Sequence, residues 1–291
     1  MDVAEIVLPD EQEIELRGLH LHYHDWGNPT APAVVFLHGG GLTAHTWDAV
    51  CLGLRSRYHC LAIDFRGHGD SEWSEDYEID AHVEDVRAFI AALGLKRVNL
   101  AGMSMGGMVA VRYAGRYPDL GSLVVIDVGP ETGRQEGARR IQNFVDGAEL
   151  DTIDEFVERS LKFNPKRDRD MLRASLLHNL RQLPNGKWTW KYDRRHYLRP
   201  RDPAKLVEFI KDTWALVPEI TCPVLVVRGG ESDILSADAG RRLAASFPSA
   251  RYVEVPRAGH TVQGDNPADL TRELLHFLSE VTGSRLVAES P

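Results

Sequence analysis

Apolar runs rich in β-branched residues alternate with segments of helical periodicity, and this alternation constrains the fold more than any other feature. The runs in the first half of the chain are AVVFL (33–37), CLAID (60–64), RVNLAGM (97–103) and SLVVIDV (122–128). Unbroken runs of this kind are typical of parallel strands that are buried on both faces. Between them, residues 80–93 place apolar side chains on one helical face, namely Val83, Val86, Phe89, Ile90 and Leu93.

The same pattern resumes near the C-terminus, with PVLVVRG (223–229), a helix over 236–247, RYVEV (251–255) and a helix from Pro267 to about Glu280. Proline is well suited to the first turn of that last helix. The opening stretch EIELRGLHLHYHDW alternates apolar and polar residues, which predicts two antiparallel strands hinged near Gly18. We therefore predict an α/β fold with a mostly parallel sheet of about eight strands and helices on both sides.

The segment 131–217 interrupts this rhythm, because it is charged, contains Trp188, Trp190, Tyr192 and Trp214, and shows no strand-like run. It holds 18 Lys and Arg against 14 Asp and Glu, whereas the rest of the chain holds 16 against 29. We predict a basic helical cap at 131–217, inserted into a core domain formed by 1–130 and 218–291. A chain of 291 residues can bury a core large enough for both.

Charge and composition exclude several classes of partner. The net charge of −9 disfavours nucleic acid and anionic lipid, which both select basic surfaces. No apolar run reaches the roughly 18 residues that a membrane span needs. The N-terminal MDVAEIVLPDEQEIEL carries acids where a secretory signal carries lysine or arginine, so we expect a cytoplasmic protein. Cys51, Cys60 and Cys222 lack CxxC spacing and are interpreted as reduced structural thiols.

A candidate nucleophile lies in the stretch Gly102-Met103-Ser104-Met105-Gly106. In G-x-S-x-G the serine occupies a sharp strand-to-helix turn that the flanking glycines permit. The pentapeptide alone is weak, but an apolar run precedes it and a helix that ends near Pro118 follows it. We therefore interpret Ser104 as a nucleophile.

A serine hydroxyl needs a base within hydrogen-bond reach and an acid that orients this base. Asp233 follows the strand 223–229 and His260 follows the strand 251–255. Catalytic groups of such sheets gather at the carboxyl ends of strands. We therefore predict a triad of Ser104, Asp233 and His260, with His260 as the general base and Asp233 as the orienting acid.

Several motifs together resemble the α/β-hydrolase superfamily, in particular its branch of cap-bearing esterases and C–C hydrolases. They are HGGG (38–41), Trp47, DFRGHGDS (64–71), GMSMGG (102–107), GGESD (229–233) and AGH (258–260), within a resemblance from about 14 to 280. The resemblance implies an oxyanion hole formed by the backbone N–H groups of Gly40 and Met105. His38 is expected to brace this loop, and Arg66 and Asp70 to hold a tight turn rather than to perform chemistry.

Asp127 is an alternative acid. Some relatives take the acid from the strand after the nucleophile helix, and VVIDVGP places Asp127 there. The other interpretation is a structural acid that binds loop backbone near the cap. Relatives with a relocated acid tend to lack the later aspartate, so we favour Asp233.

Metal and nucleotide sites have little support in the sequence. His20, His22 and His24 fall on one face of a predicted strand and could hold a metal, but their spacing does not match HxHxDH. We favour a solvated strand face. The glycine loops 39–41 and 67–69 lack a phosphate-binding signature. We therefore expect neither a metal nor an organic cofactor.

The predicted function is hydrolysis of a small-molecule carboxylic ester through an acyl-enzyme, by a monomer or homodimer. C–C hydrolases of ring-cleavage products share fold and triad, but commonly carry tryptophan where this chain has Thr261. Lactonase and thioesterase activity stay open, and a non-catalytic ligand receptor would retain the same motifs. Cap arginines facing the cleft could bind a carboxylate-bearing monoester, or else form a solvated surface paired with acids; they are Arg134, Arg139, Arg140, Arg181, Arg194 and Arg195.

Overall fold

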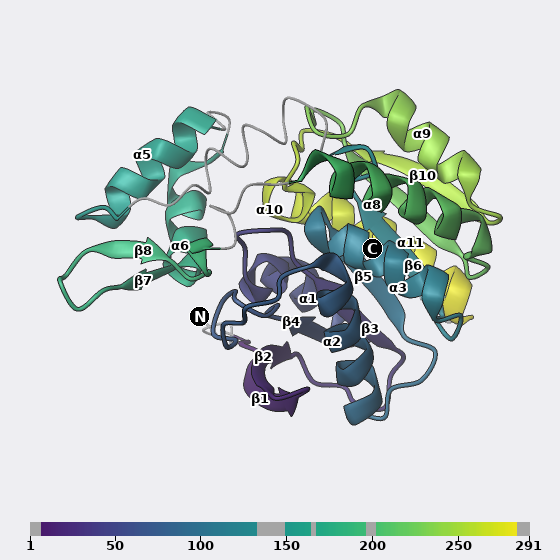
Figure 1. Cartoon of the computed structure of the whole chain (residues 1–291), viewed down its shortest axis with the longest axis horizontal. Helices are drawn as coiled ribbons and strands as arrows, with labels where there is room; N and C mark the ends of the chain where they lie inside the picture. The colour runs from purple at the N-terminus through teal and green to yellow at the C-terminus, as the bar shows by residue number, and fades with distance from the viewer. Residues whose placement is uncertain (1–6, 133–148, 164–166, 196–201, 284–291) are drawn as a thin grey trace, which may run out of the picture.

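An eight-stranded sheet forms the centre of the molecule, with the strand order β1-β2-β4-β3-β5-β6-β9-β10. The computed structural model describes residues 7–132, 149–163, 167–195 and 202–283 (Figure 1). The strands are β1 (Asp10–Leu16), β2 (Leu19–Asp25), β3 (Ala33–Leu37), β4 (His59–Ile63), β5 (Asn99–Met103), β6 (Ser122–Ile126), β9 (Val224–Gly229) and β10 (Ala250–Val255). Strands β1 and β2 pair antiparallel, and β2 pairs antiparallel with β4. All other pairs in the sheet are parallel.

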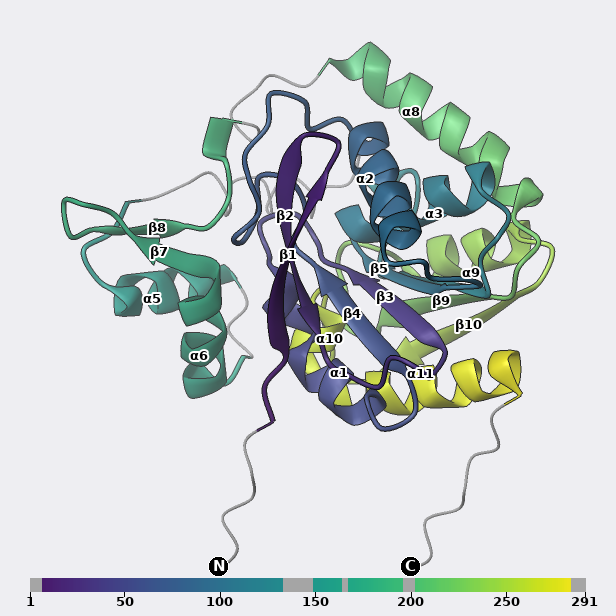
Figure 2. The same cartoon turned by 90° about the horizontal axis from the view of Figure 1, so that it is seen from below.

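Helices cover both faces of this sheet (Figure 2). They are α1 (Asp48–Leu54), α2 (Ile79–Ala92), α3 (Met105–Arg116), α8 (Pro203–Leu216), α9 (Ala237–Ser246), α10 (Val262–Asp265) and α11 (Pro267–Thr282), with the 3-10 turns η1 (Ala44–Trp47) and η3 (Val217–Glu219). Alternate residues of β3 enter opposite cores: Val35 packs with α2 and α3, whereas Phe36 packs with α1 and α11. The predicted fold class is confirmed.

The strand order determines where the candidate site lies in the sheet. The chain passes from β3 to β4 on one side and then returns to β5 on the other side of β3. Adjacent parallel strands whose connections leave in opposite directions open a crevice at their carboxyl ends. The loop after β3 begins at His38, and Ser104 directly follows β5. The predicted oxyanion loop and the predicted nucleophile therefore flank this crevice.

A separate small cluster of secondary structure lies beside the sheet domain (Figure 1). It contains α5 (Ile153–Phe163), α6 (Arg169–Asn179) and a hairpin of β7 (Leu180–Gln182) and β8 (Trp188–Trp190). It has its own core, formed by Ile153, Phe156, Val157, Leu172, Leu176, Leu180, Trp190 and Tyr192. The prediction that this region lacks strands was wrong. The Asn185-Gly186 pair in the connecting loop is the usual signal of such a turn, and Gly186 has φ 83°.

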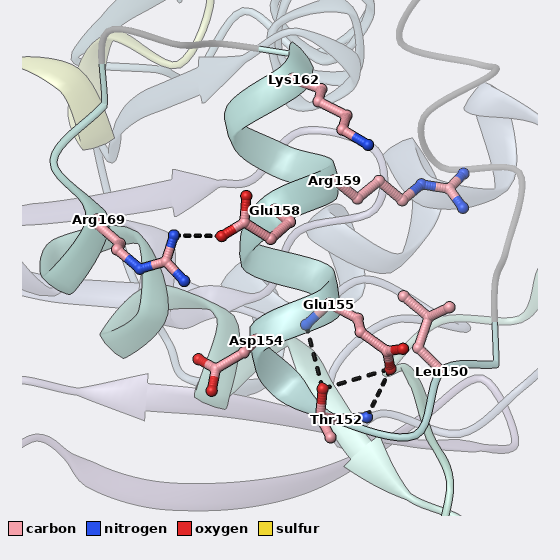
Figure 3. Close-up of a pocket in the computed structure, with 8 residues that line it drawn as sticks. All are labelled: Leu150, Thr152, Asp154, Glu155, Glu158, Arg159, Lys162 and Arg169. Carbon is pink, nitrogen blue, oxygen red and sulfur yellow. Dashed lines mark hydrogen bonds and ion pairs between the residues drawn. The ribbon is translucent and has the colours of Figure 1, made fainter.

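Figure 3 shows how α5 begins in this cluster. Glu155 accepts a hydrogen bond from the backbone N–H of Thr152, while Thr152 Oγ1 accepts one from the backbone N–H of Glu155. This reciprocal arrangement is a capping box. Glu158 pairs with Arg169 at the start of α6 at 2.5 Å. The charged side chains around this surface pocket thus fix the ends of two helices.

The last helix of the predicted cap segment, α8, belongs to the sheet domain instead. Its Thr213 accepts a hydrogen bond from Arg112 of α3 at 3.1 Å, and the Arg112 guanidinium lies 5.0 Å from the centroid of the Phe209 ring. Gly115 of α3 leaves room for Leu216. These contacts place α8 on the face of the sheet that α3 covers. Among the described residues, no helix is long and apolar enough to span a membrane.

The histidines of β2 lie on a buried face, so the predicted solvated strand face was wrong for two of them. His20 is exposed, but His22 is only 6% exposed and His24 is completely buried. The loop after β4 packs against His22, because Ser71 Oγ accepts from the backbone N–H of His22 and the backbone N–H of Asp64 donates to the His22 carbonyl. The His45 ring of η1 packs against His24, with ring centroids 4.2 Å apart.

Candidate active site

Ser104 sits on a strained turn between β5 and α3. Its backbone angles are φ 53° and ψ −118°, a conformation that non-glycine residues rarely adopt. The turn is tight because a Cβ atom on Gly102 would lie 2.2 Å from the carbonyl oxygen of Gly106. The backbone N–H of Ser104 donates to the carbonyl of Ile126 in β6 at 3.1 Å. This geometry exposes a serine at the carboxyl edge of the sheet, as a nucleophile elbow does.

Replacing Gly102 by alanine is expected to lower the free energy of unfolding by about 3 kcal/mol, because the new methyl group would collide with backbone rather than with a flexible side chain. Urea denaturation measures this change. Gly129→Ala is the matched control, because its Cβ would lie 3.6 Å from its nearest neighbour, an ordinary contact. An equal effect of both substitutions would contradict the close approach at Gly102.

His38 braces the loop after β3, as predicted. The ring is completely buried, and its Nε2 accepts a hydrogen bond from the backbone N–H of Phe65 at 3.0 Å. Its Nδ1 lies 2.7 Å from the carbonyl oxygen of Gly39. Burial lowers the pKa of His38, which agrees with a neutral ring that donates through one nitrogen and accepts through the other. The His38 carbonyl in turn accepts from the backbone N–H of Gly106 at 3.1 Å.

These contacts hold the loop after β3 against the nucleophile turn. A Cβ on Gly39 would lie 3.3 Å from the Cβ of Ser104. Met105 is the first residue of α3, so its N–H has no partner within the helix. Across the described residues, no hydrogen-bond acceptor is found for the Gly40 N–H. Met105 directly follows Ser104, and Gly40 directly follows Gly39, the residue that approaches Ser104, so their role as oxyanion donors stays a prediction.

Asp127 contacts His260. Asp127 directly follows β6 and is completely buried, and its Oδ2 lies 2.8 Å from His260 Nδ1. Asp233 is exposed in the loop after β9. The structure thus places Asp127, the alternative acid of the sequence, against His260 Nδ1, and the role of Asp233 stays a prediction.

Two further donors fix the Asp127 carboxylate. Gly229 N–H donates to Oδ1 at 3.0 Å, and Ser232 Oγ donates to Oδ2 at 2.5 Å. Ser232 was not among the predicted site residues, although it lies in the GGESD motif next to Asp233. This motif therefore contributes to the site through its serine, which bridges from the β9 loop to the acid after β6.

His260 lies in the loop after β10, with 14% of its side chain exposed. The loop is held by Asp265 of α10, whose Oδ2 accepts from the backbone N–H of Gly259 at 2.9 Å. Asp265 also pairs with Arg167 from the region between α5 and α6, at 3.1 Å. Among the described contacts, no hydrogen bond joins Ser104 to His260. Catalytic hydrogen bonds are often long before substrate binds.

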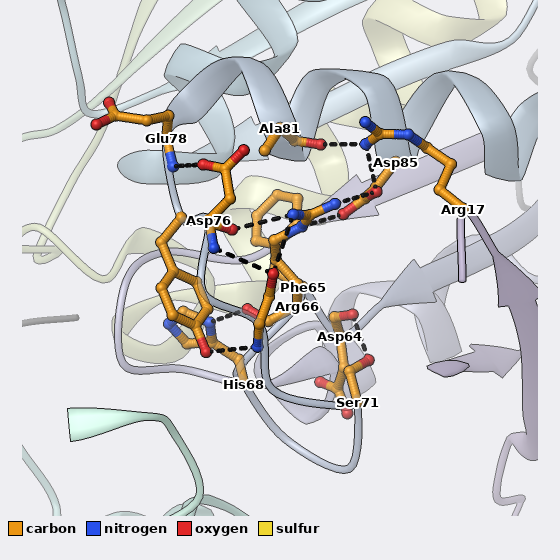
Figure 4. Close-up of polar contacts among 12 residues, drawn as sticks. Arg17, Asp64, Phe65, Arg66, His68, Ser71, Asp76, Glu78, Ala81 and Asp85 are labelled. Atoms are coloured by element: carbon orange, nitrogen blue, oxygen red, sulfur yellow. Dashed lines mark hydrogen bonds and ion pairs between the residues drawn. The ribbon is translucent and has the colours of Figure 1, made fainter. Parts of the chain in front are cut away.

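The loop that follows β4 supports the site from the side (Figure 4). Arg66 forms a bidentate pair with Asp85 of α2, at 2.6 and 2.7 Å. Asp70 pairs with Lys191 beyond β8, at 2.6 Å. No described contact joins either residue to Ser104. Both do more than hold a local turn, because Arg66 connects this loop to α2 and Asp70 connects it to the small cluster.

Asp64 is the buried anchor of the same loop. It accepts hydrogen bonds from His22 Nδ1 at 2.8 Å and from the backbone N–H of Ala44 at 2.6 Å. Although burial acts in the opposite direction, these bonds and the nearby imidazoles lower the pKa of Asp64 to about 2. In His22, burial is likewise outweighed by the bond to Asp64, so the pKa of His22 is raised.

The lowered pKa of Asp64 predicts an acid-sensitive contribution to stability. An unfolded aspartate titrates near about 3.9, so the contribution is fully present above that pH and is lost as the pH falls through about 2. The difference in unfolding free energy between the wild type and Asp64→Asn should therefore shrink between pH 4 and pH 2 in urea titrations. A difference that stays constant over this window would contradict it.

The arginines of the predicted cap divide into two groups. Arg134, Arg139 and Arg140 lie outside the described residues. The others are engaged: Arg194 pairs with Glu149 at 3.4 Å, Arg195 with Asp193 at 2.7 Å, and Arg181 lies over the Trp73 ring at 4.9 Å. These contacts agree with the interpretation of a paired surface.

Comparisons with known proteins agree with this geometry. The profile of the alpha/beta hydrolase family matches residues 34–273. The chain is 35% identical to esterase Rv0045c of Mycobacterium tuberculosis, over 89% of this chain and 85% of that protein. It is 31% identical to a 3-hydroxybutyrate-oligomer hydrolase of Cupriavidus necator, over 89% and 93% respectively. The crystal structure of esterase Rv0045c superposes with a TM-score of 0.75 at 32% identity, covering 94% of this chain and 92% of that one.

A sharp strand-to-helix turn at Ser104, a glycine loop beside it and a buried aspartate–histidine pair on a mostly parallel sheet are features of the alpha/beta hydrolase fold. With the match over most of its length, the chain belongs to the alpha/beta hydrolase family.

Proposed function

We propose that this chain hydrolyses carboxylic esters of small molecules, with Ser104 as nucleophile, His260 as general base and Asp127 as orienting acid. The contact of His260 Nδ1 with the buried Asp127 carboxylate at 2.8 Å carries the proposal. This hydrogen bond selects the tautomer in which Nε2 can accept a proton. The names of relatives such as esterase Rv0045c support ester hydrolysis.

The reaction proceeds in two steps. His260 accepts the Ser104 hydroxyl proton as Oγ attacks the carbonyl carbon, and the N–H groups of Gly40 and Met105 stabilise the negative oxygen. Each such donor is worth about 3–4 kcal/mol where it has been removed from a hydrolase. The protonated His260 then donates its proton to the departing alkoxide, leaving an acyl group on Ser104. His260 deprotonates a water molecule, which cleaves this acyl-enzyme and restores the serine.

We infer that residues 149–195 form a cap over the site, a narrower segment than the predicted 131–217. Three contacts support this assignment, because they join the small cluster to loops beside Ser104 and His260. They are Arg167 with Asp265, Lys191 with Asp70, and the backbone N–H of Asp193 with the Gly67 carbonyl at 2.7 Å. The cap would thus select the substrate while the sheet edge performs the reaction.

Turnover of p-nitrophenyl butyrate by the purified chain tests the proposed activity. We expect serine-dependent release of p-nitrophenol. If no ester, lactone or thioester of a panel is hydrolysed measurably, the proposed activity is contradicted. That result would favour a ligand receptor on this scaffold.

The paired arginines favour neutral esters. Because Arg194 and Arg195 already pair with carboxylates of the chain, a substrate carboxylate would have to displace an existing partner. We expect kcat/KM for a neutral ester to equal or exceed that for a carboxylate-bearing ester of the same length. Steady-state kinetics on such matched pairs measures this preference. A more than about tenfold preference for the charged ester would instead indicate that unpaired cap arginines bind it.

A further inference from the structure

Histidines from separate parts of the chain meet where the small cluster approaches the sheet domain. They are His24 of β2, His45 of η1 and His178 of α6. The ring centroids of His24 and His45 lie 4.2 Å apart, and those of His45 and His178 lie 3.9 Å apart. Charged imidazolium rings at such distances would repel each other, so this arrangement is suited to neutral rings, the form that binds metals.

His24 presents unsatisfied polar atoms to this cluster. The residue is completely buried, and neither ring nitrogen has a hydrogen-bond partner among the described residues. The Oδ1 of Asp48 lies 3.6 Å from His24 Nδ1, which is too long for a hydrogen bond. Leaving a buried polar group without a partner costs about 1–3 kcal/mol. A bound ligand at His24 would remove this cost.

A carboxylate completes a set of metal-binding groups. Glu11 of β1 lies opposite His24 in the antiparallel register. One ligand atom from each of Glu11, His24 and His45 lies within 4.8 Å of the others. Zinc–ligand bonds are about 2.0–2.2 Å long, so tetrahedral ligands stand roughly 3.4 Å apart. Glu11 is exposed and His45 is half-buried, so both can close the remaining distance.

Asp48 is placed to orient the His45 ring for metal binding. Its Oδ2 lies 2.8 Å from His45 Nδ1. A carboxylate that accepts from one ring nitrogen fixes the proton there, so the other nitrogen can donate its lone pair to a metal. Such a carboxylate is the usual outer partner of a metal-bound histidine. The exposed position of His178 gives the ion access from solvent.

We propose that Glu11, His24 and His45 bind a first-row divalent transition metal ion of the zinc type, and that His178 adds a ligand from α6. Imidazole nitrogens with one carboxylate favour zinc over calcium or magnesium, which prefer all-oxygen sites. The ion would join α6 to η1. The turn η1 is also hydrogen-bonded to α10, the helix that follows His260, because Gln263 Nε2 donates to Thr46 Oγ1 at 2.9 Å.

A second group, His22, Asp64 and Asp70, also brings ligand atoms together. This second group differs from the His24 cluster because its ligand atoms already have hydrogen-bond or ion-pair partners. Asp64 Oδ2 accepts from His22 Nδ1 at 2.8 Å and from the backbone N–H of Asp70 at 3.1 Å. The side chain of Asp70 is paired with Lys191. We therefore assign metal binding to the His24 cluster alone.

Isothermal titration of Zn²⁺ into the metal-stripped full chain tests the site. His260→Ala serves as the background, so that the catalytic imidazole contributes no binding and the result does not depend on ester hydrolysis. We expect one Zn²⁺ per chain. His45→Ala and Glu11→Gln should each weaken Kd at least about tenfold, and Asp48→Asn by about tenfold through loss of the outer partner. Glu11 is exposed and His45 is half-buried, so these variants leave the completely buried His24 in place.

His20→Ala is the matched control, because His20 lies on the same strand but is exposed and should leave Kd unchanged. His178→Ala tests the ligand from α6 and should weaken Kd about tenfold. Absence of saturable binding, or an unchanged Kd in His45→Ala, would overturn the site. An unchanged Kd in His178→Ala would overturn the contribution of α6. Far-ultraviolet circular dichroism of each variant confirms that it is folded.

Discussion

Ser104→Ala is expected to lower kcat for p-nitrophenyl butyrate by about five to six orders of magnitude, because the hydroxyl that forms the acyl-enzyme is lost. The oxyanion donors remain in this variant, so a small rate above the uncatalysed reaction should persist. Stopped assays with high enzyme concentration measure both. Ser56→Ala, at an exposed position in the turn after α1, should retain the wild-type rate. A Ser104→Ala variant that keeps about a tenth of the activity would exclude Ser104 as nucleophile.

The second large effect separates the two aspartates. Asp127→Asn should lower kcat by about 10⁴-fold, because an amide cannot hold His260 in the tautomer that accepts the serine proton. Asp233→Asn should leave kcat within about threefold of the wild type, because Asp233 is exposed whereas Asp127 is buried against His260. Parallel kinetics on both variants is therefore decisive. A severe loss in Asp233→Asn with little change in Asp127→Asn would restore the acid predicted from the sequence.

Asp127→Asn also disturbs a buried network, because Gly229 and Ser232 donate to this carboxylate. Ser232→Ala provides a comparison that removes one donor but keeps the acid. We expect it to lower kcat far less than Asp127→Asn does, by about tenfold or less. Thermal denaturation of both variants separates unfolding from loss of catalysis.

The sheet could be predicted from the sequence because its strands are buried on both faces. Such strands appear as continuous apolar runs, and β3 has the predicted bounds Ala33–Leu37. The candidate nucleophile, Ser104, could be predicted for a related reason. Gly102 is required by the tight turn itself, and Gly106 by the close approach of the Leu37 and His38 carbonyls, so both glycines of the motif reflect the geometry around Ser104.

The acid could not be assigned from local sequence. Asp127 and Asp233 both follow strands, and which carboxylate reaches the His260 ring is decided by how the loops after β6 and β10 meet. This meeting joins residues that are 133 positions apart. The burial of His24 was missed for a similar reason, because the His45 ring that packs against it comes from η1 and not from the strand itself.

The hairpin of β7 and β8 illustrates a different limit. Each strand has only three residues, so neither shows a readable alternation. Trp188 and Trp190 were interpreted as part of a helical region, yet Trp190 packs against Phe156 with ring centroids 5.1 Å apart. The turn residues Asn185 and Gly186 were the available signal.

Labelling with a fluorophosphonate, followed by peptide mass spectrometry, tests the central claim most directly, because the reagent reacts only with an activated serine. We expect a single adduct on Ser104, formed rapidly in the wild type and in Asp233→Asn but slowly in Asp127→Asn. An adduct on another residue, or labelling of Asp127→Asn at the wild-type rate, would contradict it.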